Sequence, residues 1–114
     1  MNALVNRVQL IGSLGQDPEV KKFDNGKQLA KFSLATNETY KNAQGEKVTN
    51  TTWHNLVAWG KTAGILEKYV RKGDKICVEG KLVNRQYEDK DGITRYVTEV
   101  EAHEVLMLGQ KKPA

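Results

Sequence analysis

The chain has 114 residues, which fits a single domain that can bury a core without disulfides or a metal. Hydrophobic residues make up 39% of the sequence and charged residues 28%, with a net charge of +4. There is no apolar run of the length that spans a membrane and no secretory signal pattern, so we expect a cytoplasmic protein. The basic balance is compatible with a polyanionic partner, but solvated lysines alone would give the same charge.

The first half of the chain predicts three β-strands separated by polar segments. The strand patterns occur at residues 4–14, 29–36 and 51–59. The segments between them are predicted as a turn-rich region at 16–26 and a long hairpin loop at 37–50. In the third strand, alternation places Trp53 and Trp59 on one side and His54 on the other.

The second half predicts one helix and two further strands. Apolar residues recur at helical spacing within residues 61–72, namely Ile65, Leu66, Tyr69 and Val70. Strand patterns return at 75–87 and 95–108, with Asp91 and Gly92 as a hairpin turn between them. This order predicts an all-β OB-fold, a five-stranded Greek-key barrel with one short helix between strands 3 and 4. We expect one domain over residues 1–109 and a short basic tail at 110–114.

Enzymatic chemistry is disfavoured by the motifs that the sequence lacks. It contains neither a phosphate-binding loop ending in Gly-Lys-Ser/Thr nor a Gly-x-Ser-x-Gly elbow. His54 and His103 with the single cysteine, Cys77, have no zinc-site spacing, and Cys77 fits a half-buried strand position. The acidic residues near Asp89 fit a solvated hairpin tip better than a nuclease metal site. We therefore expect no catalytic residue, no metal and no cofactor.

Aromatic residues beside basic ones point to a nucleic-acid surface. Bases of single strands stack on such rings at about 1–3 kcal/mol each, while cations follow the phosphates. Tyr40 and Tyr87, at strand–loop junctions, are predicted to be exposed, and Trp53 and Trp59 fit either core or surface. Phe32 and Tyr69 fit buried faces and are predicted to belong to the core. The basic candidates are Arg7, Lys61, Arg71, Lys72 and Arg85.

Several motifs in one order resemble the bacterial single-stranded DNA-binding protein (SSB) family. They are residues 5–12 (VNRVQLIG), 14–20 (LGQDPEV), 34–38 (LATNE) with Tyr40, 53–54 (WH), 59–61 (WGK), 69–73 (YVRKG), 78–82 (VEGKL), 95–96 (RY), 98–100 (TEV) and 107–109 (MLG). The resemblance covers about residues 4–109. It implies an OB-fold homotetramer that binds single-stranded DNA with little sequence preference during replication, recombination and repair, in the cytoplasm and associated with the nucleoid.

The resemblance also assigns roles to individual residues. Base stacking falls on Tyr40, Trp53, Trp59 and Tyr87. Backbone contacts fall on Arg7, Lys61, Arg71, Lys72 and Arg85. The subunit interface falls on Asn6, Val8, Leu10 and His54, with the first strand pairing with its copy along an open edge.

Two departures from the family pattern bear on these expectations. Tyr40 and Tyr87 stand where the best-known members carry tryptophan, and Trp59 stands where they carry phenylalanine, so all three positions stay aromatic. The family's acidic tail, which recruits replication and repair proteins, is absent from this sequence, so no such recruitment is expected. The alternative functions are an OB-fold module that binds protein or oligosaccharide, a specialised, plasmid-borne or primosomal relative, and a metal nuclease.

Overall fold

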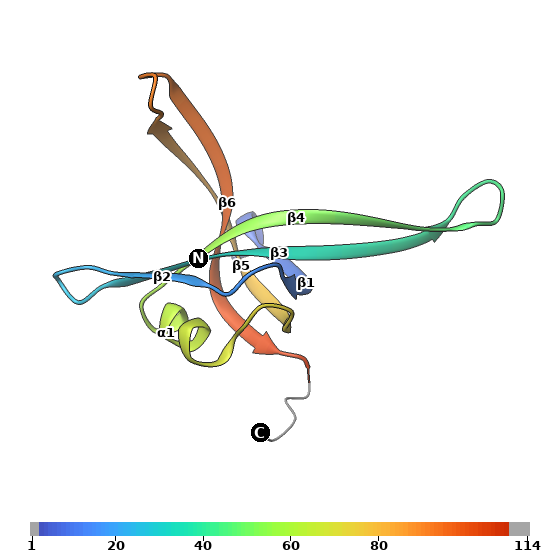
Figure 1. Ribbon diagram of the computed structural model, residues 1–114, viewed down its shortest axis with the longest axis horizontal. Coiled ribbons are helices and arrows are strands. Elements are labelled where there is room, and N and C mark those ends of the chain that lie inside the picture. The colour runs from blue at the N-terminus through green and yellow to red at the C-terminus, as the bar shows by residue number, and fades with distance from the viewer. Residues whose placement is uncertain (1–2, 110–114) are drawn as a thin grey trace.

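The computed structural model describes residues 3–109, which form a β-barrel with one helix and long projecting hairpins (Figure 1). The elements in chain order are a 3-10 helix η1 (Ala3–Asn6), β1 (Val8–Leu14), β2 (Glu19–Lys22), β3 (Gln28–Lys41), β4 (Lys47–Trp59), α1 (Gly60–Tyr69), β5 (Lys75–Glu88) and β6 (Thr94–Met107). None of the helices in this part of the chain is long and apolar enough to cross a membrane.

The strands form one sheet that closes on itself. Their order is β1-β5-β6-β4-β3-β2, and a further pairing of β1 with β3 at Ser13 and Leu14 completes the barrel. All pairs are antiparallel except β4 with β6, which are parallel and are connected through α1 and β5. The predicted OB-type barrel of five long strands and one helix is confirmed. The prediction missed β2, a strand of four residues that pairs only with the start of β3 inside the turn-rich region.

The core lies inside the barrel, where alternate residues of the strands meet the helix. Leu34, Leu56, Ile76 and Val78 point inward from three of the strands, and Leu66 packs on them from α1; all five are at most 1% exposed. Phe32 is also buried, as predicted. The buried set is small, so the long hairpin ends outside the barrel rest on strand pairing rather than on a core.

A β-bulge lies where β5 and β6 leave the core. Glu79 faces Glu104 and Gly80 faces Ala102, so His103 is the extra residue of β6. A Cβ on Gly80 would collide with the carbonyl oxygen of Glu101, which explains the glycine. Because of the extra residue, the outward side of β6 changes from odd-numbered residues before the bulge to even-numbered residues after it.

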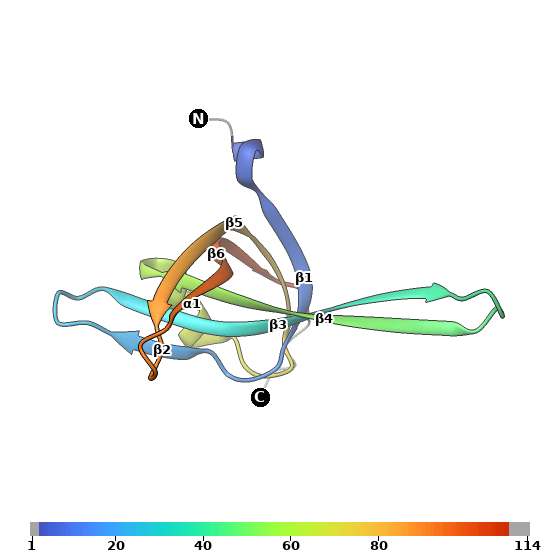
Figure 2. The same ribbon diagram turned by 90° about the horizontal axis from the view of Figure 1, so that it is seen from above.

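The predicted loop at residues 37–50 is mostly strand. β3 and β4 pair without a break from Leu29 opposite Trp59 to Lys41 opposite Lys47, and only residues 42–46 form the turn. This ribbon projects from the barrel, at the right in Figures 1 and 2. Its side chains are mostly exposed on both faces, so the sequence shows no apolar alternation there. A cross-strand hydrogen bond of 2.6 Å from Thr51 Oγ1 to Asn37 Oδ1 helps to hold it.

Three further expectations about local structure need correction. Residues 4–6 belong to η1 rather than to the first strand. Tyr69 is 53% exposed rather than buried, because the helix face that meets the core runs through Ala63 and Leu66. The helix also ends at Tyr69, three residues earlier than predicted, where Val70 takes an extended conformation and enters the core.

Candidate nucleic-acid interface

One outward surface of the barrel gathers residues from four strands, β3, β4, β5 and β6. In β4 the residues with odd numbers point outward from Trp53 to Trp59, and strand register continues this row across β3 and β6. Lys31, Val57 and Glu101 lie side by side in this way, and Glu101 faces Lys81 of β5. We call this surface the aromatic face; it carries Trp53, Trp59, Lys31, Val83, Arg85 and Tyr87.

Two adjoining hollows mark the middle of the aromatic face. The larger, of about 530 Å³, is lined by Trp59, Lys31 and Arg85, among others. The smaller, of about 250 Å³, shares Lys31 and Arg85 and continues past Asn55 towards the β1–β2 connection. Together they form an open groove with an aromatic ring at one end and amide groups from Asn55 and Asn84. Its charged lining consists of the cations Lys31 and Arg85 and the carboxylates Asp17, Glu19, Glu99 and Glu101. The ring offers a stacking surface for a flat base, and the two cations offer contacts for phosphates.

Trp53 lies on the same side of β4, next to the smaller hollow. Its ring is packed so close to Gly15 that a Cβ on that glycine would come within 2.7 Å of it. The side chain is nevertheless 60% exposed. The absence of a side chain on Gly15 lets the indole pack against the β1–β2 connection while Trp53 stays largely exposed. Of the two positions that the sequence allowed for Trp53, core or surface, surface is correct.

Trp59 is 46% exposed and has an aromatic neighbour that the sequence analysis did not select. The ring of Phe23 lies 6.3 Å from the Trp59 ring, centroid to centroid, with 25° between their planes. Phe23 is 41% exposed and follows β2 directly. The missed signal was alternation: Glu19, Lys21 and Phe23 share one side of the short strand that the prediction took for a turn.

Arg85 and Glu99 form the main ion pair of the groove. Nε and Nη2 of Arg85 donate to the two carboxylate oxygens of Glu99 at 3.0 and 3.2 Å. Glu99 is 8% exposed, and its hydrogen bond and charge raise the pKa of Arg85 above the ordinary range. The guanidinium also lies over the Tyr87 ring, 5.9 Å from the centroid. Arg85 therefore has a structural partner and an aromatic contact before any ligand arrives.

Tyr40 is not brought together with the other three aromatics. It pairs with Val48 in the projecting ribbon, and this register puts it on the opposite face of the ribbon from Trp53. Tyr40 is 49% exposed, so the predicted exposure is correct. An extended ligand that lies only in the groove would not contact Tyr40.

The other predicted basic residues lie outside the groove. Arg7 pairs with Glu79 at 2.8 Å on the β1 side of the barrel. Arg71 donates to the carbonyl oxygens of Glu67 and Val70 at the C-terminal end of α1. The backbone N–H of Lys72 donates to Asp17, while its side chain is exposed. Arg71 thus has a capping role in the chain itself.

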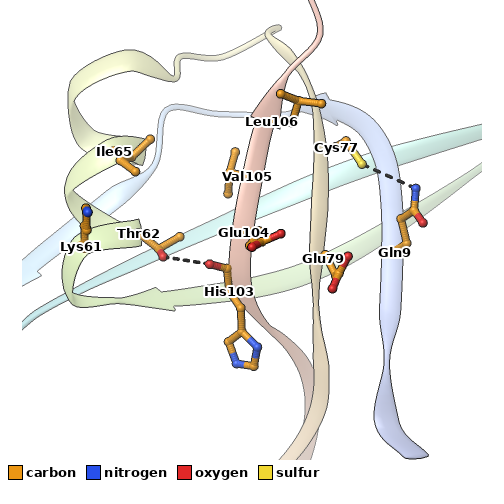
Figure 3. A pocket seen from close by; sticks show the side chains of 10 residues that line it. All are labelled: Gln9, Lys61, Thr62, Ile65, Cys77, Glu79, His103, Glu104, Val105 and Leu106. Atoms are coloured by element: carbon orange, nitrogen blue, oxygen red, sulfur yellow. Dashed lines mark hydrogen bonds between the residues drawn. The ribbon is translucent and has the colours of Figure 1, made fainter. Parts of the chain in front are cut away.

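Lys61 lies beside a different hollow, of about 580 Å³, between α1 and the outer side of β1, β5 and β6 (Figure 3). We call this surface the β1–β5–β6 face. Its central cross-strand row is Ile11, Cys77 and Leu106, in which Ile11 is 48% and Leu106 63% exposed. Gln9 reaches Cys77 Sγ at 3.7 Å, and Cys77 is half-buried as predicted.

The predicted interface residues lie at and beside β1. Asn6 hydrogen-bonds both the N–H and the carbonyl of Leu82, at 3.0 and 2.9 Å, within its own chain. Val8 and Leu10 are partly buried against the barrel core. His54 Nε2 lies 3.0 Å from Thr36 Oγ1, in a hollow that Leu10 also lines.

The acidic turn between β5 and β6 is built from internal bonds. Asp89 accepts hydrogen bonds from Arg95 Nε and from the N–H groups of Asp91 and Ile93, each at 2.8–2.9 Å. The bond from Arg95 is the main cause that lowers the pKa of Asp89. Among residues 3–109 no three His, Cys, Asp or Glu side chains are grouped so that they could hold a metal ion.

Comparison with known proteins identifies what this arrangement resembles. Residues 5–108 match the profile of the Single-strand binding protein family. The Single-stranded DNA-binding protein of Bacteroides thetaiotaomicron is 48% identical over 109 residues, covering 94% of this chain and 68% of the relative. That of Neisseria meningitidis is 43% identical over 105 residues, covering 92% of this chain and 60% of the relative. A solved structure, the Plasmodium falciparum SSB complex with ssDNA, superposes with a TM-score of 0.81 at 30% identity, covering 91% of this chain and 95% of that one.

Proposed function

The chain belongs to the single-strand binding protein family, whose function is to bind single-stranded DNA without catalysis, and on that premise we propose that the aromatic face is where it does so. Bases stack on Trp53, Trp59 and Tyr87, and Lys31 and Arg85 lie where phosphates would pass. Stacking accepts any base, so the binding has little sequence preference.

The observation that carries this proposal is the exposure of two tryptophans on one side of one strand. Trp53 and Trp59 are 60% and 46% exposed, although burying such a side chain would ordinarily be favourable. Both flank a groove that also holds cations. An exposed pair of this kind beside Lys31 and Arg85 is suited to flat, anionic ligands.

Tyr40 and the outlying basic residues extend the proposal to longer DNA. Tyr40 lies on the projecting ribbon, so we propose that it contacts a strand that has left the groove. Lys61, Arg71, Lys72 and Arg7 are kept as proposed backbone contacts along such a longer path. Of these, Lys61 and Lys72 have side chains without a partner among residues 3–109, which favours them over Arg7 and Arg71.

We further propose that the chain assembles as a homotetramer that acts in replication, recombination and repair in the bacterial cytoplasm, at the nucleoid. Two features support self-association. On the side away from β5, β1 pairs within residues 3–109 only at Ser13 and Leu14, which leaves most of its edge open. The β1–β5–β6 face beside that edge carries the exposed row of Ile11, Cys77 and Leu106.

A fluorescence titration tests the proposed site. The only two tryptophans are Trp53 and Trp59, so bases stacked on them should strongly quench the intrinsic emission when oligo-dT saturates the protein. The single variants Trp53→Phe and Trp59→Phe should each keep part of the quench. Duplex DNA and a neutral oligosaccharide serve as comparisons. Equal binding of all three ligands, or oligo-dT binding without any quench, would refute the aromatic face as the site.

A further inference from the structure

Phe23 lies on the aromatic face, a position that the sequence pattern did not predict. It follows β2, and the hydrogen bond from its N–H to the Lys27 carbonyl, at 2.8 Å, continues the ladder beyond that strand. The carbonyl of Phe23 accepts from Gly26 N–H at 2.9 Å. Both bonds fix the backbone from which the ring reaches Trp59.

The neighbour of Phe23 is Trp59, whose side chain needs a fixed orientation if a base is to stack on it. Trp59 stands at the end of β4 as the residue before α1, beyond the last buried position of that strand, Ala58. A large side chain at such a boundary loses rotational freedom when it takes a ligand, and this loss weakens binding. The ring of Phe23, at 6.3 Å and 25°, packs against one side of the indole and leaves it 46% exposed.

We propose that Phe23 is a positioning residue of the DNA site. It covers one side of the Trp59 ring and holds that ring in the orientation in which a base stacks on the uncovered side. The inference rests on the proposed stacking of bases on Trp59. Phe23 itself acts through Trp59 rather than as a separate stacking residue, and this sets the form of the test.

A double-mutant cycle separates the two possibilities. Phe23→Leu keeps an apolar side chain but removes the ring; it is made in the natural sequence and in Trp59→Leu, and affinity for a short oligo-dT is measured for all four proteins. We expect Phe23→Leu to weaken binding about 3- to 10-fold when Trp59 is present, the size expected for an unfixed side chain. In the Trp59→Leu background it should change affinity less than twofold. Phe23→Tyr should restore the affinity, and Val5→Ala, which trims an exposed side chain outside the groove, should leave it unchanged.

A spectroscopic readout distinguishes positioning from a general loss of structure. In Trp53→Phe, Trp59 is the only tryptophan, and Phe23→Leu should lower the anisotropy of its emission in the free protein while the melting temperature stays within a few degrees. Equal losses of affinity in both backgrounds, or no loss in either, would overturn the inference. If Trp59→Leu itself leaves binding intact, the proposed stacking on Trp59 fails and the inference fails with it. If Trp59→Leu weakens binding and Phe23→Leu does not, only the role of Phe23 is lost.

Discussion

The aromatic face and the β1–β5–β6 face are made from overlapping strands, yet they offer different chemistry. On the aromatic face, rings of Trp59 and Phe23 are exposed beside Lys31. On the β1–β5–β6 face, the exposed row is Ile11 and Leu106 around Cys77, and the nearby Arg7 is already paired with Glu79. The two faces differ in the cation that lies beside the exposed apolar side chains: Lys31 forms no ion pair among residues 3–109, whereas Arg7 is paired with Glu79. The combination of an unpaired cation with exposed rings is what favours the aromatic face as the proposed nucleic-acid surface.

The β-bulge at Gly80 explains how one pair of strands serves both faces. Before the bulge, the outward residues of β6 are Glu99 and Glu101, which belong to the aromatic face. After it, they are Glu104 and Leu106, which belong to the other face. One inserted residue, His103, therefore separates the proposed DNA-binding surface from the proposed assembly surface.

The largest expected effect lies on the β1–β5–β6 face. Ile11→Asp places a charge in the exposed apolar row, where a subunit contact would have to desolvate it. We expect sedimentation of the natural protein at micromolar concentration to give a tetramer and that of the variant to give smaller species. Affinity for an oligo-dT short enough for one barrel should change less than twofold.

The matched control for this change is Val5→Asp, which adds the same charge at a side chain that is 85% exposed and lies outside that row. It should leave the tetramer intact. A natural protein that sediments as a monomer, or an Ile11→Asp protein that stays tetrameric, would show that this face does not assemble the chain.

The next effect concerns the two tyrosines of the β5–β6 hairpin. Tyr87 is on the aromatic face and 47% exposed, whereas Tyr96 is 77% exposed and points to the opposite side of the β5–β6 hairpin. Tyr87→Ala should weaken oligo-dT binding by about 1–3 kcal/mol, the value of one stacked base. It should reduce stability only by the contact with Arg85, about 0.5–1 kcal/mol. Tyr96→Ala should change neither quantity appreciably.

Thermal melting and oligo-dT titration of both variants check this prediction. A Tyr87→Ala protein that melts many degrees lower but binds with full affinity would assign the ring to the fold instead of the site. A variant at Arg85 could not replace Tyr87→Ala in this test. Its removal would leave the buried Glu99 without a partner, so lost binding could not be separated from lost stability.

The sequence predicted the barrel well because its core residues alternate cleanly. In β5 the buried residues Ile76 and Val78 are two positions apart, as in a strand with one buried face. In α1 the buried residues Ala63 and Leu66 are three positions apart, as on one face of a helix. The sequence failed where a strand has no buried side. The ribbon around Tyr40 is exposed on both faces, so its polar residues looked like a loop, and its length and register could not be inferred.

The site was predictable in kind but less so in membership. Trp53, Trp59 and Tyr87 were selected as aromatics near basic residues, and strand register places them on one face. Pairing of charges cannot be read from sequence, because the partners are distant in the chain: Arg7 and Glu79 are 72 residues apart. Phe23 was missed for the same reason, since its contact with Trp59 depends on a short strand that the pattern did not reveal.

The smallest expected effect compares two neighbouring lysines of β2. Lys21 faces Leu29, which in turn faces Trp59, so Lys21 is on the aromatic face. Lys22 points the other way and forms an ion pair with Glu67 of α1 at 3.6 Å. Each phosphate that a lysine neutralises on a single strand contributes about −0.7 to the slope of log affinity against log salt. Lys21→Ala should therefore make that slope shallower by about 0.7, whereas Lys22→Ala should leave it unchanged. The two variants carry the same net charge, so a general effect of charge would change both slopes equally, and that result would contradict a DNA path across the β2 side of the groove. Oligo-dT titrations at four or more salt concentrations give the slopes.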